Sequence, residues 1–299
     1  MSTLDTTTRP VRHRRAWLRI FFGGLLLWVV TVIVTFVTGN PNLVPTVILL
    51  GSFLVPVTFV AYAFEHRATE TMTEHSIFVA FIYGGVLGVL GASLLEGAFL
   101  GRTSTITYFW VGLIEEACKL AALWLVARGI PSRAPRDGIV LGAAVGFGFA
   151  AFESSGYAFT ALFTMRGLSL ASLVETEILR GILAPVGHGL WTAILGWALF
   201  RGARGGRFRV TRGLIGWYLV VALLHSFWDA AGGIATLLVL AFTTTSAQFQ
   251  AIELGRVVRP TEQQVHLYTL LTWVFLILDA IVGIVLLRSR WRRAPAVRV

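Results

Sequence analysis

Six acidic or histidine side chains fall inside long apolar segments of this sequence, where such groups are rare. Two of them, Glu115 and Glu116, are adjacent in GLIEEACKLAAL, residues 112–123. The other four are Glu153, His188, His225 and Asp229. Carboxylates and imidazoles act as general bases, bind divalent metal ions and stabilise an oxyanion. If the segments bring these side chains together, the set predicts hydrolytic chemistry.

The charge of such a layer leaves two chemical arrangements open. With neutral histidines, four carboxylates and the ammonium of Lys119 sum to a net charge of −3, which cannot persist in a dry interior. Protonation of one or two acids would leave a glutamate as general base for water, aided by histidine donors. Alternatively, His188, His225 and an acid would bind zinc, with a remaining glutamate as base.

The composition is that of an integral membrane protein. Hydrophobic residues make up 56% of the 299 residues and charged residues only 13%, against roughly 25% in a soluble domain. The net charge of +10 is carried by arginines between the apolar segments, so we expect membrane topology signals and no nucleic-acid partner. The single cysteine, Cys118, excludes an internal disulfide.

Hydropathy predicts an all-α, polytopic membrane helix bundle with about eight transmembrane helices of roughly 20 residues each. The first is longer than the apolar region of a signal peptide and no A-x-A site follows it, so we expect a retained anchor. The predicted spans are residues 17–38, 43–64, 76–100, 105–127, 138–163, 179–200, 214–242 and 267–287.

The arginines between the spans predict the orientation of the chain, because cytoplasmic loops retain positive charge. One side has 19 arginines and the other has five, namely Arg102, Arg166, Arg180, Arg256 and Arg259. Both termini belong to the arginine-rich side, so we expect them in the cytoplasm. We expect a disordered basic tail at 1–15, one membrane domain at 16–290 and a basic tail at 291–299.

The six side chains and Lys119 lie near the middle of four predicted spans and therefore share one depth. The three charges of span 105–127 would cost ~8–10 kcal/mol facing lipid, and its apolar residues return only ~3–5 kcal/mol. This span must therefore lie inside the bundle. Glu115 and Lys119 are spaced i, i+4, and Glu116 competes at i, i+3, so we expect Lys119 to neutralise one glutamate.

Small residues predict which helix faces meet protein instead of lipid. A stripe of small residues in span 138–163 continues through Glu153, so this glutamate is expected to face protein. In span 179–200, Pro185 weakens the helix just before His188. His225 and Asp229 are one turn apart on one face. Asp279 and Glu96 are interpreted as structural or snorkelling. The two stripes are Gly142, Gly146 and Ala150, and Ala184, His188, Thr192 and Gly196.

Four motifs on successive spans resemble the PrsW family of intramembrane proteases, which is similar to the CAAX-prenyl-endopeptidase and bacteriocin-processing group. They are EEACK, GFGFAAFESSGYAF, HGLWTAILG and LLHSFWD, within residues 70–240. Glu115 and Glu116 match the paired glutamates, and Glu153, His188 and His225 with Asp229 match the later motifs. This chain departs from the CAAX-type pattern at two positions. The pattern has a histidine where this chain has Glu153. It also has an arginine four residues after the second glutamate, whereas this chain has Lys119 three residues after Glu116.

The resemblance implies an intramembrane endopeptidase of the bacterial cell membrane that cleaves a membrane-anchored protein, for example an anti-sigma factor. The PrsW resemblance implies a metalloprotease, whereas similarity to the CAAX group implies a glutamate-type mechanism without a metal. Both alternatives, with and without zinc, therefore stay open. We expect Glu115 or Glu116 as general base, with Glu153, His188, His225 and Asp229 binding zinc or stabilising the oxyanion. The alternatives are a non-catalytic scaffold or immunity protein and a proton-coupled transporter, for which we find no inverted repeat.

Overall fold

The computed structural model describes residues 15–65, 72–101, 106–256 and 259–294. Residues 1–14 and 295–299 of the two predicted tails lie outside the described residues. The last helix, however, continues to Arg293, beyond the expected end of the membrane domain at residue 290.

Nearly all of the described chain is helical. The one sheet among the described residues is a hairpin of two short antiparallel strands. The helices are α1 (Ala16–Thr38), α2 (Val44–Glu65), α3 (Glu74–Phe99), α4 (Thr107–Arg128), α5 (Pro135–Ala161), α6 (Leu170–Leu183), α7 (His188–Arg201), α8 (Arg212–Thr243), α9 (Ser246–Glu253) and α10 (Glu262–Arg293). The strands are β1 (Phe163–Thr164) and β2 (Gly167–Leu168), and two 3₁₀ turns are η1 (Pro41–Leu43) and η2 (Ala184–Val186).

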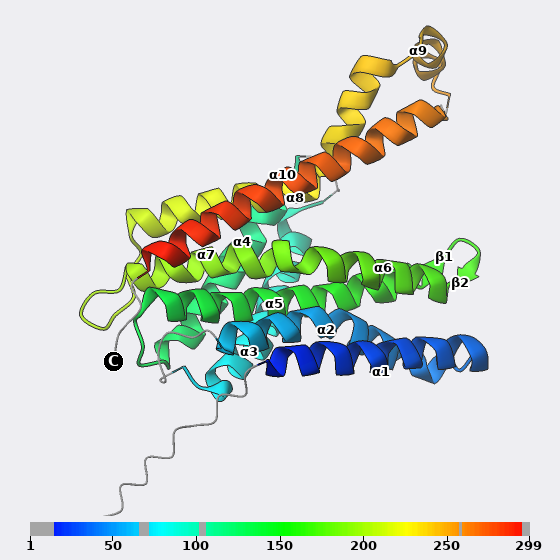
Figure 1. Ribbon diagram of the computed structural model, residues 1–299. Helices are drawn as coiled ribbons and strands as arrows, with labels where there is room; N and C mark the ends of the chain where they lie inside the picture. Colours follow the sequence, from blue (N-terminus) through cyan, green and yellow to red (C-terminus); the bar gives the residue numbers. More distant parts are fainter. Residues whose placement is uncertain (1–14, 66–71, 102–105, 257–258, 295–299) are drawn as a thin grey trace, which may run out of the picture.

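The helices form an antiparallel bundle in which α1 begins and α10 ends at the same end, here called the terminal end (Figure 1). The opposite end, here called the hairpin end, carries β1, β2 and α9 (Figure 1). Among the described residues, seven helical segments are long and apolar enough to cross a membrane. Helix α4, which corresponds to the eighth predicted span, is not one of these seven, because every 18-residue stretch of it contains at least three charges. The predicted all-α membrane bundle is confirmed.

Helix α5 forms the centre of the bundle, where it packs most extensively against α7 and α3. Its small residues permit this packing, because a Cβ at Gly142 or Gly146 would overlap the carbonyl oxygen of Thr192 or His188. The predicted small-residue stripes therefore face each other across the α5–α7 contact.

The sixth crossing is broken in its middle. Helix α6 ends at Leu183, the η2 turn contains Pro185, and α7 begins at His188. Proline removes a backbone donor and clashes with the preceding turn, which explains the break. The expectation that Ala184 and His188 share one helical stripe is wrong, because they lie on different elements. As the first residue of α7, His188 sits at the positive end of that helix dipole.

Side-chain caps mark where several helices begin. Thr73, Ser169 and Thr211 each accept a hydrogen bond from the backbone amide three residues ahead. Thr261 and Gln264 form a reciprocal capping box at the start of α10. The connection between α8 and α10 contains the short helix α9.

Candidate active site

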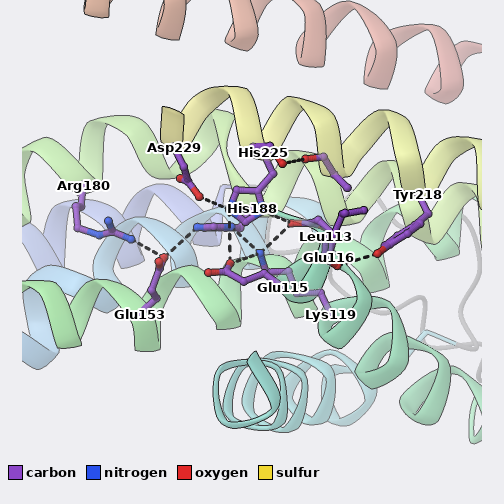
Figure 2. Close-up of polar contacts among 12 residues, drawn as sticks. Leu113, Glu115, Glu116, Lys119, Glu153, Arg180, His188, Tyr218, His225 and Asp229 are labelled. Carbon is purple, nitrogen blue, oxygen red and sulfur yellow. Dashed lines mark hydrogen bonds and ion pairs between the residues drawn. The ribbon is translucent and has the colours of Figure 1, made fainter. Parts of the chain in front are cut away.

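Lys119 lies at the centre of a buried polar cluster between α4, α5, α7 and α8 (Figure 2). Its Nζ atom is 3.0 Å from Glu115 Oε2 and 2.9 Å from Glu116 Oε1. The same atom is 2.8 Å from His188 Nδ1 and 3.9 Å from the ring centre of Phe149. The lysine therefore contacts both glutamates, whereas we expected it to neutralise one, because positions i+3 and i+4 both lie within its reach.

His188 connects this centre to a second acidic group. Its Nε2 atom is 3.0 Å from Glu153 Oε2, and Arg180 of α6 donates to the same carboxylate oxygen at 2.6 Å. The Arg180 guanidinium also donates from Nε to Ser154 Oγ and stacks 4.2 Å from the ring centre of Tyr157. A chain of contacts thus runs from α6 through α5 to the start of α7 (Figure 2).

His225 of α8 places both ring nitrogens against carboxylates. Its Nδ1 atom is 2.9 Å from Glu116 Oε1, and Nε2 is 3.5 Å from Glu115 Oε2 and 3.4 Å from Asp229 Oδ2. The imidazole stacks on Trp191 at 4.7 Å between ring centres. This stacking fixes the plane of the ring and thereby the direction of its two nitrogens.

The cluster is closed at one side and partly open at the other. The side chains of Lys119 and Glu116 are 0% exposed, whereas His188 is 13%, Glu153 20% and Asp229 25% exposed. Exposure therefore rises from the α4 face toward Glu153 of α5 and Asp229 of α8. Glu153 and Asp229 are therefore more accessible to water than the paired glutamates.

Arg180 adds one positive charge to the cluster, which the charge count made from the sequence did not include. With neutral histidines, the four carboxylates and the two cations Lys119 and Arg180 sum to −2. One oxygen, Glu116 Oε2, is buried and has no hydrogen-bond partner among the described residues. A divalent cation has the charge that would balance this set.

Three of the side chains offer donor atoms suited to one metal ion. Glu115, His188 and His225 each have a ligand atom within 4.8 Å of the other two. Two imidazoles and a carboxylate are a donor set found in catalytic zinc sites, so the residues fit a metal ion. Both histidines belong to the ligand set predicted from the sequence. Glu153 and Asp229 lie beside one histidine each.

Some functional contacts were missed from the sequence and some isolated acids remain outside the cluster. Arg180 was counted only as a topology signal, although its place at the start of predicted span 179–200, one span after the unpaired Glu153, could have suggested that the two residues are partners. Asp279 of α10 is buried, and neither of its carboxylate oxygens has a hydrogen-bond partner among the described residues. Glu96 lies near the end of α3, and no hydrogen bond or ion pair links it to the cluster.

The chain matches the model of a known protein family. A family model described as PrsW family intramembrane metalloprotease matches residues 15–252, which is more than half of the chain. The matched range contains every side chain of the polar cluster. No curated protein and no solved structure matches the chain significantly.

Proposed function

Because the chain belongs to the PrsW family of intramembrane metalloproteases and is therefore a membrane-embedded peptide hydrolase, we propose that the Lys119 cluster is its active site. The observation that carries the proposal is the convergence of Glu115, His188 and His225 within 4.8 Å, next to a second buried glutamate. Peptide hydrolysis needs a base for water and positive charge near the carbonyl oxygen, and this cluster has residues of both kinds.

Glu116 is the proposed general base. Its Oε1 atom is held by Lys119 and His225, so the carboxylate has a defined orientation. Its Oε2 atom has no partner among the described residues and is free to accept a proton from water. The choice between the two glutamates follows from this difference, because Glu115 belongs to the candidate metal donors.

Glu115, His188 and His225 are the residues that would hold a metal ion, proposed to be zinc. When bound, zinc polarises a carbonyl group and makes water more acidic. Glu153 orients His188 and Asp229 orients His225 through Nε2, as carboxylates commonly do for metal-binding imidazoles. Nδ1 of each ring is then the nitrogen that would face a metal ion, in exchange for its present contact with Lys119 or Glu116. In this proposal Glu153 and Asp229 support the histidines from outside, which differs from their expected role as ligands.

The substrate is proposed to be a membrane-anchored protein that approaches between α6 and α8. Exposure of the cluster increases in that direction, from His188 to Glu153 and Asp229. A lipid-embedded substrate can reach this side without leaving the membrane. A bacterial anti-sigma factor with one membrane span is the proposed example of this substrate class.

The proposed location is the bacterial cell membrane, with both termini in the cytoplasm. The arginine-rich connections α4–α5 and α7–α8 belong to the same side as the termini, because each follows an even number of crossings. The hairpin end would then face outward.

A cleavage assay with matched variants tests this function. The purified protein is reconstituted with a single-span anti-sigma factor, and cleavage is followed for the wild type, Glu116→Gln, His188→Ala and the exposed control Glu175→Gln. We expect Glu116→Gln and His188→Ala to abolish cleavage and Glu175→Gln to retain it. Full cleavage by Glu116→Gln would show that Glu116 is not the general base. Full cleavage by both Glu116→Gln and His188→Ala would show that the Lys119 cluster is not the active site.

A further inference from the structure

A second feature lies on the opposite face of α4 from the polar cluster. It is a groove of about 600 Å³ between α4 and α8, lined mainly by apolar side chains. On α4 the lining residues recur at spacings of three and four and so form one helical face. They are Ala117, Leu120, Ala121, Trp124, Leu125 and Arg128.

This face points away from the candidate active site. At 100° per residue, the mean direction of the lining residues is roughly 160° from that of Glu115, Glu116 and Lys119. The exposed positions Ala117, Ala121 and Leu125 form its open side. A substrate segment in this groove would therefore lie behind the catalytic helix, where it could not reach the paired glutamates.

The length of the groove corresponds to one leaflet of a bilayer. From Ala117 to Arg128 it extends over 11 residues of helix, or roughly 16 Å. This is about half of the ~30 Å hydrocarbon thickness of a membrane. Its deep end is bounded by Tyr218, whose hydroxyl donates to the backbone oxygen of Leu113 at 2.8 Å (Figure 2).

The shallow end of the groove carries an unengaged positive charge. Arg128 is exposed at the last residue of α4 and has no hydrogen bond, ion pair or ring contact with any other described residue. The two arginines that follow it in the sequence differ. Arg133 in the α4–α5 connection stacks on Phe208, and Arg136 in the first turn of α5 stacks on Trp291. The arginine at the mouth is thus available to an external anion.

We propose that this groove is a binding site for an anionic phospholipid of the leaflet at the terminal end. One acyl chain lies along Ala117, Ala121 and Leu125, and the phosphate group contacts the guanidinium of Arg128. Guanidinium groups bind phosphate oxygens in bidentate pairs. The position of the charge at the mouth of a leaflet-long apolar groove is what selects a lipid over a protein helix.

Photocrosslinking tests the site directly. The full-length protein in nanodiscs receives phosphatidylglycerol with a diazirine in its acyl chain, and crosslinked peptides are identified by mass spectrometry. Excess phosphatidylglycerol or phosphatidylcholine is then added as competitor. We expect crosslinks to concentrate in residues 117–128 and 210–218, and phosphatidylglycerol to compete about fivefold better, as one arginine near anionic lipid predicts.

Two variants separate the groove from general contact with lipid. Ala121→Trp fills the groove and Arg128→Gln removes the charge, while Leu94→Trp on the lipid-facing side of α3 and Arg204→Gln serve as controls. We expect Ala121→Trp to abolish the localised crosslinks and Arg128→Gln to remove the preference for phosphatidylglycerol.

Crosslinks spread evenly over the lipid-facing helices, or equal competition by the two lipids on the wild type, would overturn the proposal. Unchanged crosslinking in a folded Ala121→Trp variant would also overturn it. If that variant does not fold, the wild-type crosslink map and the two competitors decide the question.

Discussion

The Nζ atom of Lys119 lies 2.8 Å from Nδ1 of His188, a residue 69 positions further along the chain. An ammonium group can only donate, so Nδ1 must accept. The proton of the neutral imidazole is therefore on Nε2, which donates to Glu153 at 3.0 Å. This contact sets the tautomer of the histidine, and it joins α4 to the start of α7 at the middle of the bundle.

Replacing the buried lysine should destabilise the protein. Lys119→Met leaves two glutamates without their shared cation, and losing one partner of a buried ion pair costs about 3–5 kcal/mol. We expect this loss in the free energy of unfolding, measured in detergent. The double variant Lys119→Met with Glu116→Gln should lose less than the sum of the single variants, because one stranded charge is gone. Strict additivity would contradict the contact between these two residues.

Metal content should follow the three candidate donors. We expect about one zinc ion per chain, removed by a chelator with a fall in melting temperature. His188→Ala and Glu115→Gln should lose the metal, whereas Glu153→Gln should weaken zinc affinity about 10-fold to 100-fold. Cys118→Ser is the matched control and should keep full metal content. Elemental analysis and zinc titration measure both quantities. Loss of zinc from Glu153→Gln but not from Glu115→Gln would instead make Glu153 the metal ligand and Glu115 a supporting residue.

Arg180 should act on catalysis through Glu153 and His188. Arg180→Gln removes the 2.6 Å contact that holds Glu153. We expect kcat to fall about tenfold to a hundredfold with little change in KM, because positioning is lost and substrate binding is not. Arg180→Lys should restore part of kcat, and Arg166→Gln in the hairpin should match the wild type. A rise in KM alone would instead make Arg180 a substrate contact.

The close approach of α5 and α7 should depend on small residues. Gly146→Ala places a methyl group against the backbone oxygen of His188, whereas a methyl at Gly156 meets nothing. We expect Gly146→Ala to lower stability by about 1–3 kcal/mol and to reduce cleavage, since His188 must shift. Gly156→Ala should leave the melting temperature and the cleavage rate unchanged. Equal behaviour of the two variants would refute the predicted dependence on small residues.

Cysteine labelling should report the orientation in the membrane. In a Cys118→Ser background, Met165→Cys lies in the hairpin and Arg204→Cys lies in the connection between α7 and α8. A membrane-impermeant maleimide on intact cells should label Met165→Cys, and should label Arg204→Cys only after permeabilisation. The reverse pattern would place both termini outside.

Periodicity and hydropathy were sufficient for much of this architecture. Each of the eight predicted apolar segments contains one or two helices, and seven helical segments are long and apolar enough to cross a membrane. The small-residue stripes through Gly142 and Thr192 face protein as expected, and the structure shows that they face each other. The ionisable side chains of the cluster could be identified because charge inside a membrane is costly enough to require a partner. Helical spacing also explains why Glu115, Glu116 and Lys119 lie close together, since all three belong to one helix.

The contacts between helices could not be read in this way. Spacing along one helix says nothing about its rotation and depth relative to the next, and these depend on how the side chains of both helices pack. Only the tertiary structure therefore joined Lys119 to His188, His225 to Glu116, and Arg180 to Glu153. The sequence by itself determined which groups needed partners. The packing decided which partners they received, because the distance and rotation between helices are properties of the assembled bundle.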